Sequence, residues 1–473
     1  QSRQGAPGRP RFTIPSALRC RPGPPGCPGR DGLRSCSPDP APRQCGTVPG
    51  PTQTAQDPFT GQDITVEAGI PKGVPADAID LTGNGGLCKR IITPGDPSAG
   101  MPFGGAEQIR WSPDGKELCY TARRVPDPEA STDSSLWVVP VAGGEHRNLT
   151  EGMPGYDQEP RYAPDGRWIA FSSMARASFE ADRVRLMLHD RKASTNRELL
   201  PGFDASPHDV SWSADSKQLF FTVDVEGTTQ IYRTSIDKPK AVPVTTGRHR
   251  LSSIQLTPDA KTIYAMMTTT ERAAEVVHID VDSGRITMVT DVNHDAYEGM
   301  SLPVVEAEWF EATDGKKVHA WIIKPPNFDA TKRYPMLLYC QGGPQSMVGQ
   351  WFSYRWNFHL MAAQGYVIAA VNRRGLPGFG QAWNDQISRD WGGQAMRDLL
   401  SVNDAMAKRD YIDEDRVGAV GASFGGYSVY WLMGNGGDRF RCMISHCGVF
   451  NLESMLESLR TQVTKLQTPS PVL

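Results

Sequence analysis

A serine stands at a predicted sharp bend between a strand and a helix. The run GASFGG at residues 421–426 places Ser423 after the apolar segment RVGAVGA and before an amphipathic helix, YSVYWLM. A serine at such a bend adopts strained backbone angles that expose its hydroxyl, and side chains at the flanking glycine positions would collide. The start of the helix also directs backbone N–H groups toward the site. The pattern predicts that Ser423 is a nucleophile for acyl transfer, and a bare structural turn is the alternative.

Acyl transfer through this serine needs two hydrogen-bond donors for the oxyanion. The backbone N–H of Phe424, directly after the serine, is the first candidate. The second is expected from the loop YCQGGPQS at residues 339–346, where Gln341 and Gly342 are the candidates. Glycine in this loop lets the backbone approach a ligand closely. An ordinary Gly-Pro turn is the alternative for this segment.

The elements that position this site alternate between apolar strands and helices. YPMLLYC, YVIAAVN and RVGAVGA are predicted buried strands, and WNFHLMAAQG and GGQAMRDLLSVNDAMAKRD are predicted helices. This alternation is typical of a parallel-rich sheet covered on both faces. With the strand pair around Asp314-Gly315 counted first, Ser423 follows the fifth strand and RCMISHCG is the sixth. We therefore predict an α/β domain over residues 301–473.

Residues 57–300 are predicted to form a β-propeller domain. The phrases IRWSPDGKELCYTA, PRYAPDGRWIAFSS, VSWSADSKQLFFTV and IQLTPDAKTIYAMM repeat a tight turn before an alternating strand. Their aspartates, Asp114, Asp165, Asp215 and Asp259, are 51, 50 and 44 residues apart. Four short strands in each 40–50 residues are typical of a propeller blade. Four blades can be recognised in the sequence, and residues 57–100 are candidates for part of another blade.

Residues 1–56 form a segment of different composition. Residues 1–50 contain eleven Pro, eight Gly and eight Arg but no Lys. Such a segment cannot bury enough apolar surface to offset its ordering entropy, so we predict disorder. A collagen-like reading fails because the glycine period breaks on both sides of GPPGCPGRDG. A mis-joined coding segment is a second hypothesis for this composition.

Composition and charge exclude several classes of partner and cofactor. The net charge of −3 gives no reason to expect nucleic acid or an anionic membrane as a partner. No run approaches the roughly 20 apolar residues of a membrane span. No CxxC pair or His/Cys cluster has metal-ligand spacing, so we expect no metal and no cofactor. Residues 1–15 lack the apolar run of a signal peptide.

Several motifs occur together in an order that resembles a known family. GASFGGY, QGGP, VNRRGLPGFGQ and DWGG, behind the WSPDGK repeats, are similar to the prolyl oligopeptidase family of serine peptidases. The text around SHCGVFNLESM looks most like the bacterial dipeptidyl peptidase V and acylaminoacyl-peptidase branch. The resemblance covers about residues 57–455. It implies an α/β-hydrolase domain capped by a propeller that admits short peptides, and it suggests a periplasmic or secreted location. A homodimer is compatible with it.

The resemblance also implies a catalytic triad in the chain order Ser, Asp, His, with both partners after the sixth strand. The family-like text stops near Met455, and no later histidine occurs. We therefore expect the triad Asp and His to lie outside these residues, so that the chain is inactive alone and exposes an apolar sheet edge.

His446 is the only downstream histidine, but it precedes Glu453 and Glu457 and so reverses the family's order of base and acid. His319 and His359 fall on a predicted hairpin and a predicted helix. Asp438, after the helix that follows the serine, is expected only to cap that helix or to be solvated.

The substrate-binding candidates lie in two segments. Val449, Phe450 and Leu452, followed by Met455, come after the sixth strand, where the resemblance implies a pocket for the residue before the scissile bond. Glu180 and Asp182, in the long loop MARASFEADR, are candidates for holding the free amine of a peptide. A plain core and solvated loop charges are the respective alternatives.

The predicted function is a serine peptidase that releases dipeptides or short acyl-peptides from oligopeptides, with a short peptide as its binding partner. An esterase is the alternative among enzymes. A propeller module that binds a protein partner and carries an inert hydrolase remnant is the alternative from another class.

Overall fold

The computed structural model describes residues 54–56, 63–65, 106–125 and 131–455. The chain divides into two units, residues 1–66 and 67–473. In the first unit, β1 (Thr54–Gln56) pairs antiparallel with β2 (Asp63–Thr65). The last three residues of the predicted disordered segment therefore form a strand, whereas residues 1–53 lie outside the described part of the chain. The expected extra blade in residues 57–100 also lies outside it, apart from β2.

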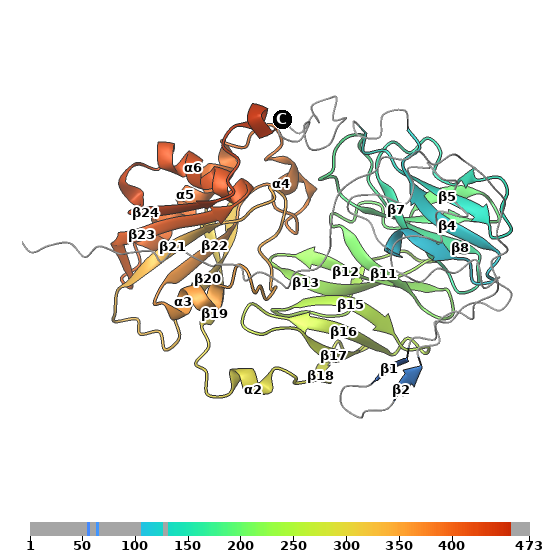
Figure 1. Cartoon of the computed structure of the whole chain (residues 1–473), viewed down its shortest axis with the longest axis horizontal. Coiled ribbons are helices and arrows are strands. Elements are labelled where there is room, and N and C mark those ends of the chain that lie inside the picture. The colour runs from blue at the N-terminus through green and yellow to red at the C-terminus, as the bar shows by residue number, and fades with distance from the viewer. Residues whose placement is uncertain (1–53, 57–62, 66–105, 126–130, 456–473) are drawn as a thin grey trace, which may run out of the picture. The chain divides into compact units, whose positions relative to one another are not determined.

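The repeats form four successive antiparallel units of strands (Figure 1). After the 3-10 helix η2 (Ala106–Gln108), the first unit comprises β3 (Ile109–Trp111), β4 (Glu117–Ala122), β5 (Ser135–Pro140) and β6 (Arg147–Asn148). The second comprises β7 (Asp157–Tyr162), β8 (Trp168–Ser173), β9 (Arg185–Asp190) and β10 (Thr195–Glu198). The third comprises β11 (Pro207–Trp212), β12 (Gln218–Val225), β13 (Thr228–Ser235) and β14 (Val242–Pro243). The fourth comprises β15 (Arg250–Leu256), β16 (Thr262–Thr268), β17 (Glu275–Asp280) and β18 (Ile286–Met288).

These units correspond to the four repeats of the sequence. The third and fourth share one sheet, because β13 and β15 pair in parallel at Thr229 and Arg250. Apolar clusters join neighbouring units, as where Leu186 and Leu188 of β9 pack with Phe221 of β12. Each unit buries one alternating set of side chains against the next, which is how a propeller builds a continuous core.

The repeated aspartates close the turns between the first two strands of each unit. Asp114, Asp215 and Asp259 each accept hydrogen bonds from a Ser or Thr hydroxyl two residues earlier and from the backbone N–H two residues later. Asp165 accepts the equivalent backbone bond from Arg167. The residue after each aspartate has positive φ: Gly115, Gly166, Ser216 and Ala260. These aspartates are thus turn-forming residues, as their sequence context predicted.

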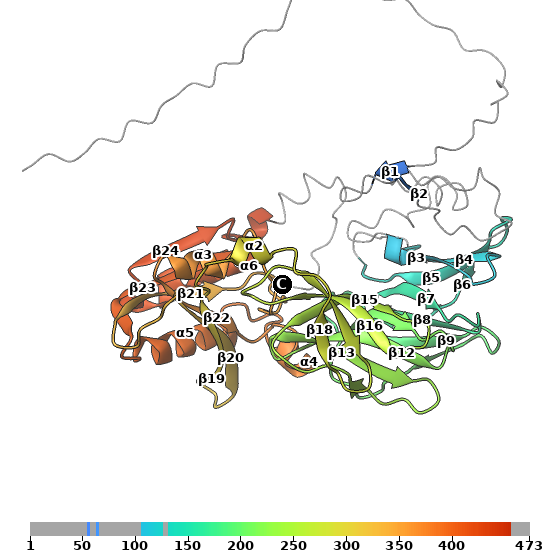
Figure 2. The same cartoon turned by 90° about the horizontal axis from the view of Figure 1, so that it is seen from below.

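A six-stranded sheet follows the short helix α2 (His294–Tyr297). Its strands are β19 (Val304–Glu311), β20 (Lys317–Lys324), β21 (Tyr334–Cys340), β22 (Val367–Asn372), β23 (Ile412–Ala422) and β24 (Cys442–His446). Their spatial order is β19-β20-β22-β21-β23-β24, and the last four strands are parallel (Figures 1 and 2). The parallel-rich sheet is confirmed, with Ser423 after its fifth strand in chain order.

Helices cover both faces of this sheet. They are α3 (Phe358–Ala363), α4 (Gln381–Asp385), α5 (Gln394–Ala407) and α6 (Phe424–Asn435), and the 3-10 helix η3 (Gly437–Arg439) follows α6. Alternate residues of β22 point to opposite faces: Val371 packs in a cluster with residues of α5 and α6, whereas Ile368 packs with residues of α3. Strands buried on both faces explain the continuous apolar runs in the sequence.

The far edge of this sheet is exposed in the described structure. β24 pairs only with β23 among the described strands, and Ile444 on it is 56% exposed. Tyr430 and Met433 of α6 are also exposed, so the predicted amphipathic character of this helix was wrong: its outward side carries large apolar side chains.

None of the helices described in the structure combines the length and the hydrophobicity that a membrane-spanning segment requires.

Candidate active site

Ser423 connects β23 to α6 in a strained backbone conformation. Its φ is 57° and its ψ is −120°, a region that costs a non-glycine residue about 1–3 kcal/mol. The Ser423 amide donates to the carbonyl of His446 at 3.0 Å, and its carbonyl accepts from the amide of Tyr427 at 3.0 Å. The side chain is exposed, and its hydroxyl makes no hydrogen bond to any described residue. The strand, the helix and the end of β24 thus hold the backbone while the hydroxyl stands free.

The glycines around this serine have no room for side chains. A Cβ on Gly421 would lie 2.7 Å from the carbonyl oxygen of Cys340, and one on Gly425 would lie 3.0 Å from the carbonyl carbon of the same residue. A Cβ on Gly426 would lie 2.9 Å from the backbone nitrogen of Gly448. These neighbours are backbone atoms, which cannot yield by rotating a side chain. The bend is therefore packed tightly between the end of β21 and the segment after β24.

The two predicted oxyanion segments meet at this bend. Phe424 is the first residue of α6, so its N–H has no acceptor within the helix. A Cβ on Gly342 would lie 2.9 Å from the carbonyl oxygen of Ala422 and 3.8 Å from Cβ of Ser423. The loop after β21 therefore passes directly over the bend, close enough for its backbone to contribute a second donor.

Gln341 is held inside this loop by its side chain. The Tyr339 hydroxyl donates to Oε1 of Gln341 at 2.9 Å, and Nε2 of Gln341 donates to the Ser346 hydroxyl at 3.2 Å. Burial raises the pKa of Tyr339 to about 12, so the phenol stays protonated and can donate. The side-chain amide of Gln341 thus stabilises the loop, and only its backbone N–H remains for an oxyanion.

None of the nine histidines hydrogen-bonds to the Ser423 hydroxyl, and all nine lie in the described residues. The backbone carbonyl of His446 accepts a hydrogen bond from the Ser423 amide. Nε2 of the His446 ring, however, lies 3.2 Å from the guanidinium of Arg355. Its ring packs edge-on against Trp356. Because a guanidinium can only donate, the lone pair of Nε2 is already used as an acceptor. This geometry disfavours His446 as the base for Ser423.

The other candidate side chains lie away from the serine. His319 on β20 is buried, its Nδ1 is 3.0 Å from Nδ2 of Asn372, and burial lowers its pKa to about 4. His359 lies on α3, where burial also lowers its pKa. Asp438 is exposed in η3, and Glu453 is exposed after β24. Glu457 lies outside the described residues.

The predicted apolar wall runs beside the bend. The Val449 amide lies 3.4 Å from the Ser423 carbonyl and donates to it. Phe450 is 84% exposed and packs edge-on against Tyr430 of α6, with ring centroids 5.8 Å apart. Leu452 is half-buried. These positions leave an apolar surface next to the serine, and its role in binding substrate stays a prediction.

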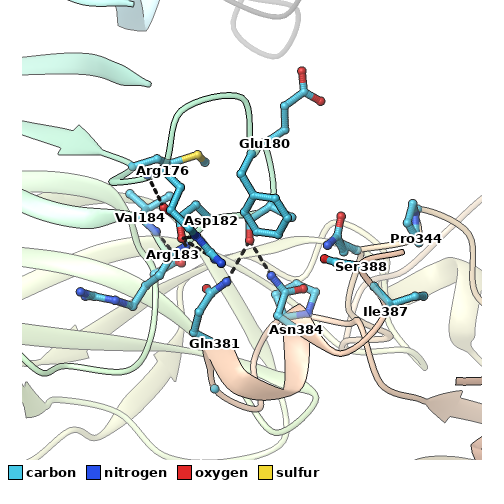
Figure 3. A pocket seen from close by; sticks show the side chains of 18 of the residues that line it. Arg176, Glu180, Asp182, Arg183, Val184, Pro344, Gln381, Asn384, Ile387 and Ser388 are labelled. Carbon is cyan, nitrogen blue, oxygen red and sulfur yellow. Dashed lines mark hydrogen bonds and ion pairs between the residues drawn. The ribbon is translucent and has the colours of Figure 1, made fainter. Parts of the chain in front are cut away.

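A cavity of about 940 Å³ lies between a propeller loop and the α/β domain (Figure 3). Residues 174–184 and 204–208 of the propeller line one side, and residues 377–391 line the other. Gly343, Pro344 and Gln345 of the loop over the serine also line it. The cavity therefore shares a wall with the oxyanion segment.

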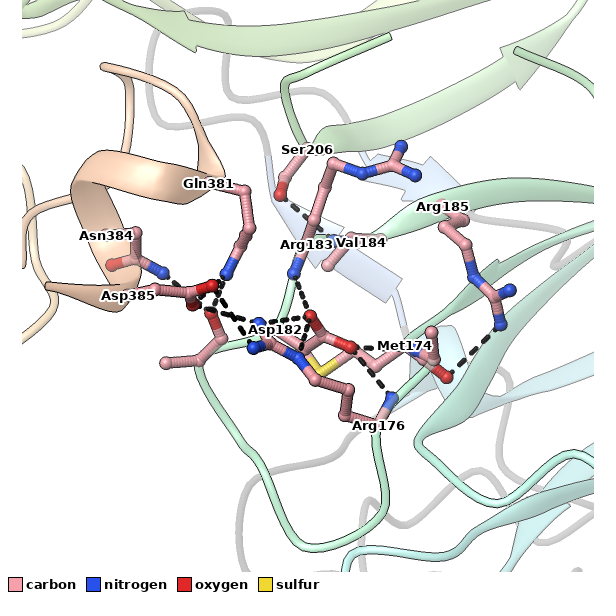
Figure 4. A network of polar contacts seen from close by, with 12 residues as sticks. Met174, Arg176, Asp182, Arg183, Val184, Arg185, Ser206, Gln381, Asn384 and Asp385 are labelled. Carbon is pink, nitrogen blue, oxygen red and sulfur yellow. Dashed lines mark hydrogen bonds and ion pairs between the residues drawn. The ribbon is translucent and has the colours of Figure 1, made fainter. Parts of the chain in front are cut away.

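The two predicted amine-binding carboxylates behave differently in this cavity. Asp182 accepts from the backbone amides of Ala175, Arg176 and Arg183, and it pairs with the guanidinium of Arg176 at 2.6 Å (Figure 4). Burial alone would raise the pKa of Asp182, but these hydrogen bonds lower it below its ordinary value. Because its oxygens are already engaged, the geometry disfavours Asp182 as an amine ligand.

Glu180 is the carboxylate of this loop that remains available. Its side chain is exposed, lines the cavity and accepts one hydrogen bond, from the Tyr156 hydroxyl at 3.3 Å. Figure 3 shows its carboxylate apart from the network around Asp182. That network extends into α4, because Arg176 also pairs with Asp385 at 2.9 Å and Asn384 donates to the carbonyl of Ala181 at 2.6 Å.

No group of three or more His, Cys, Asp or Glu side chains among the described residues could hold a metal ion.

Comparison with known sequences identifies both parts of the chain. Residues 352–471 match the Prolyl oligopeptidase family, and residues 110–303 match the TolB beta propeller domain. Dipeptidyl-peptidase 5 of Porphyromonas gingivalis is 40% identical over 354 residues, which cover 74% of this chain and 52% of that protein. The α/β part of the chain thus matches the prolyl oligopeptidase family over residues 352–471. Dipeptidyl-peptidase 5 of Trichophyton tonsurans is 31% identical over 367 residues, which cover 74% of this chain and 50% of that protein.

A solved structure agrees with these matches at the level of the fold. The acylaminoacyl peptidase of Pyrococcus horikoshii aligns with a TM-score of 0.61 at 20% identity, covering 72% of this chain and 52% of that structure. The chain thus spans about half the length of the curated relatives it matches. Its propeller and α/β-hydrolase domain are the two parts expected from the resemblance.

Sequence reasoning missed the two buried arginines that lie near the site. Arg373 and Arg374 follow β22 directly, and their exposed fractions are 0% and 2%. The signal was present in VNRRGLPGFGQ, where two arginines follow a run of apolar residues that must be buried. Two cations at the end of a buried strand indicate a site that binds carbonyls, carboxylates or both.

Proposed function

We propose that Ser423 is the nucleophile of a serine peptidase that removes dipeptides or short acyl-peptides from oligopeptides. The observation that carries this proposal is the free serine hydroxyl at a strained bend, with Gly342 packed over it and the first amide of α6 beside it. Strain of this kind persists only where the surroundings impose it, and it exposes the oxygen for attack. The names of the relatives, dipeptidyl-peptidase 5 and acylaminoacyl peptidase, support this class of reaction.

In the proposed reaction, the Ser423 oxygen attacks the scissile carbonyl and its proton passes to a general base. The amides of Phe424 and of the Gln341–Gly342 segment stabilise the oxyanion of the tetrahedral intermediate. The C–N bond then breaks, the leaving amine takes the proton, and water hydrolyses the acyl-enzyme. Because none of the nine histidines hydrogen-bonds to Ser423, we infer that the base is a histidine outside these 473 residues.

The proposed substrate is a short peptide whose free amine binds Glu180. The carboxylate is exposed at the cavity that shares Gly343 and Pro344 with the oxyanion loop. A carboxylate that keeps most of its acceptor capacity can bind an ammonium group, whereas Asp182 cannot without breaking its own contacts. This arrangement favours peptides with a free N-terminus over peptides that are acylated there.

The test uses the native protein, with any chain that accompanies these 473 residues. We expect hydrolysis of dipeptidyl 4-nitroanilides that falls to background in Ser423→Ala. Glu180→Gln should raise KM for free-amine substrates by about tenfold and leave KM for their N-acetyl analogues unchanged. Glu145→Gln, at an exposed glutamate between β5 and β6, is the matched control.

Three outcomes separate the alternatives. Hydrolysis that survives Ser423→Ala would overturn the proposal for the serine. Turnover of simple esters without turnover of peptides would favour an esterase. A folded native protein that hydrolyses neither class would favour a non-catalytic module that binds a protein partner.

A further inference from the structure

Arg373 is a buried cation without a carboxylate partner among the described residues. Its side chain has no exposed surface, and it forms no ion pair there. Burying a guanidinium is costly unless hydrogen bonds replace its water, and a carboxylate is the usual partner. Its acceptors here are three backbone carbonyls, and its Nε finds no acceptor in the described structure. The position therefore keeps a cation where packing alone would favour an apolar side chain.

Two of the three carbonyls belong to the loop over Ser423. Nη2 of Arg373 donates to the carbonyl of Gln341 and to the carbonyl of Pro344, at 3.2 Å in each case. These two acceptors bracket the Gly342-Gly343 pair. The third acceptor is the carbonyl of Arg374, at 2.8 Å from Nη1. One nitrogen thus fixes both ends of the segment that carries the second oxyanion donor.

The same guanidinium also contacts the residue that carries the first donor. Its central carbon lies 4.4 Å from the centre of the Phe424 ring, a cation–π distance. The Phe424 ring also meets Trp391, with centroids 4.8 Å apart in an edge-to-face arrangement. Arg373 is therefore in contact with both backbone segments that converge on Ser423.

The neighbouring Arg374 shows what a purely structural arginine does at this place. It pairs with Asp398 of α5 at 3.1 Å and with Asp314 of the β19–β20 turn, where the closer contact is a very short one. Its Nη1 also donates to Oε1 of Gln386, in the loop after α4, at 3.1 Å, and its guanidinium donates to no residue of the loop over Ser423. Arg374 therefore joins the turn, the helix and the loop, and it provides a matched comparison for Arg373.

Arg373 is a cation at neutral pH. Burial lowers its pKa to about 9, which still leaves the guanidinium protonated near pH 7. A fixed positive charge in a water-poor region stabilises negative charge that develops nearby.

We infer that Arg373 is a positioning residue for oxyanion binding: its guanidinium holds the Gln341–Pro344 loop and Phe424 so that their amides converge on one oxygen. This inference rests on the proposed function, because it assigns a role within the same site. It goes beyond the nucleophile and donors by naming the side chain that sets the distance between the two donor segments.

The first test needs no catalytic activity. Hydrogen exchange is measured in these 473 residues for Arg373→Met, Arg373→Lys and Arg374→Lys. We expect Arg373→Met to raise exchange of peptides covering residues 341–346 by tenfold or more, with a smaller rise in Arg373→Lys, which keeps the charge but cannot donate to two carbonyls in a plane. Arg374→Lys should raise exchange around Asp314 and leave residues 341–346 unchanged.

The second test measures kinetics in the native protein with any chain that accompanies these residues. Loss of one oxyanion donor typically lowers kcat by about 10²–10³-fold, so we expect Arg373→Met to lower kcat by about 10²-fold with KM within about threefold. Arg374→Lys should lower thermal stability without lowering kcat below its unfolding temperature. If Arg373→Met does not fold, Arg373→Lys carries both tests.

Unchanged loop exchange in the Arg373 variants, or a loss of kcat no larger than in Arg374→Lys, would overturn the inference. Hydrolysis that survives Ser423→Ala would instead overturn the proposed function, and hydrogen exchange would still decide whether Arg373 holds the loop.

Discussion

Gly425 and Gly434 both lie in α6, and replacing each with alanine separates helix propensity from packing at the bend. Alanine is favoured over glycine in a helix by about 1 kcal/mol, and this gain applies to both positions. Around Gly434, a Cβ would meet no atom within 4 Å. On Gly425, the same Cβ would lie 3.0 Å from the carbonyl carbon of Cys340 and closer still to its oxygen. The two variants therefore differ in packing against β21 and little else.

The size of the difference follows from these contacts. The contact with the Cys340 oxygen is the tighter of the two, so Gly425→Ala must separate α6 from the end of β21 by about 1 Å. Overpacking of this kind costs about 1–3 kcal/mol, and backbone neighbours place the cost at the upper end. After the gain in helix propensity, we expect a net loss of about 2 kcal/mol for Gly425→Ala. Gly434→Ala should gain up to about 1 kcal/mol.

Urea denaturation followed by tryptophan fluorescence measures both values, because Trp431 lies in α6 and Trp391 packs against Phe424 of the same helix. The displacement should also separate the two oxyanion segments, so Gly425→Ala should lose most of its Ser423-dependent hydrolysis in the native protein. Equal stability of the two alanine variants would refute the packing argument at the bend.

Two further predictions concern the propeller and the sheet edge. Burial raises the pKa of Asp157 to about 7, so the free energy of unfolding should fall by up to about 1.4 kcal/mol per pH unit as pH rises from about 4 to 7. Asp157→Asn should remove this pH dependence, which melting temperatures measured between pH 4.5 and 8 would show. An unchanged pH dependence in the variant would contradict the prediction. Ile444 on β24 is 56% exposed in the described structure, where it contributes to an apolar sheet edge. Ile444→Lys should therefore reduce the self-association of these 473 residues, as measured by sedimentation velocity. Undiminished self-association would argue against an aggregation-prone edge.

The strands around the serine could be predicted closely from sequence. YPMLLYC corresponds to β21 (Tyr334–Cys340), and YVIAAVN contains β22 (Val367–Asn372). Continuous apolar runs bounded by polar or glycine-rich segments identify strands that are buried on both faces. The turn-forming role of the repeated aspartates could also be predicted, because the turn that each one closes lies within a few residues of it.

The contacts between distant segments could not be predicted. Arg176 and Asp385 are separated by 209 residues, and the sequence around each residue does not indicate that they form an ion pair. It also does not indicate that the oxygens of Asp182 are occupied by hydrogen bonds in the same network. The position of Arg373 directly after a buried strand could be predicted from the sequence. Its hydrogen-bond acceptors could not, because they are backbone carbonyls, which every residue has. The engagement of His446 by Arg355 likewise depends on the folded loop after β21.

Whether the oxygen of Ser423 forms the acyl-enzyme can be measured with a fluorophosphonate probe, which reacts covalently with activated serines. The native protein is labelled with the probe, and mass spectrometry locates the adduct. We expect one adduct, on Ser423, which disappears when the residue is replaced by alanine. A folded native protein that hydrolyses peptides but carries the adduct on another residue, or carries none, would contradict it.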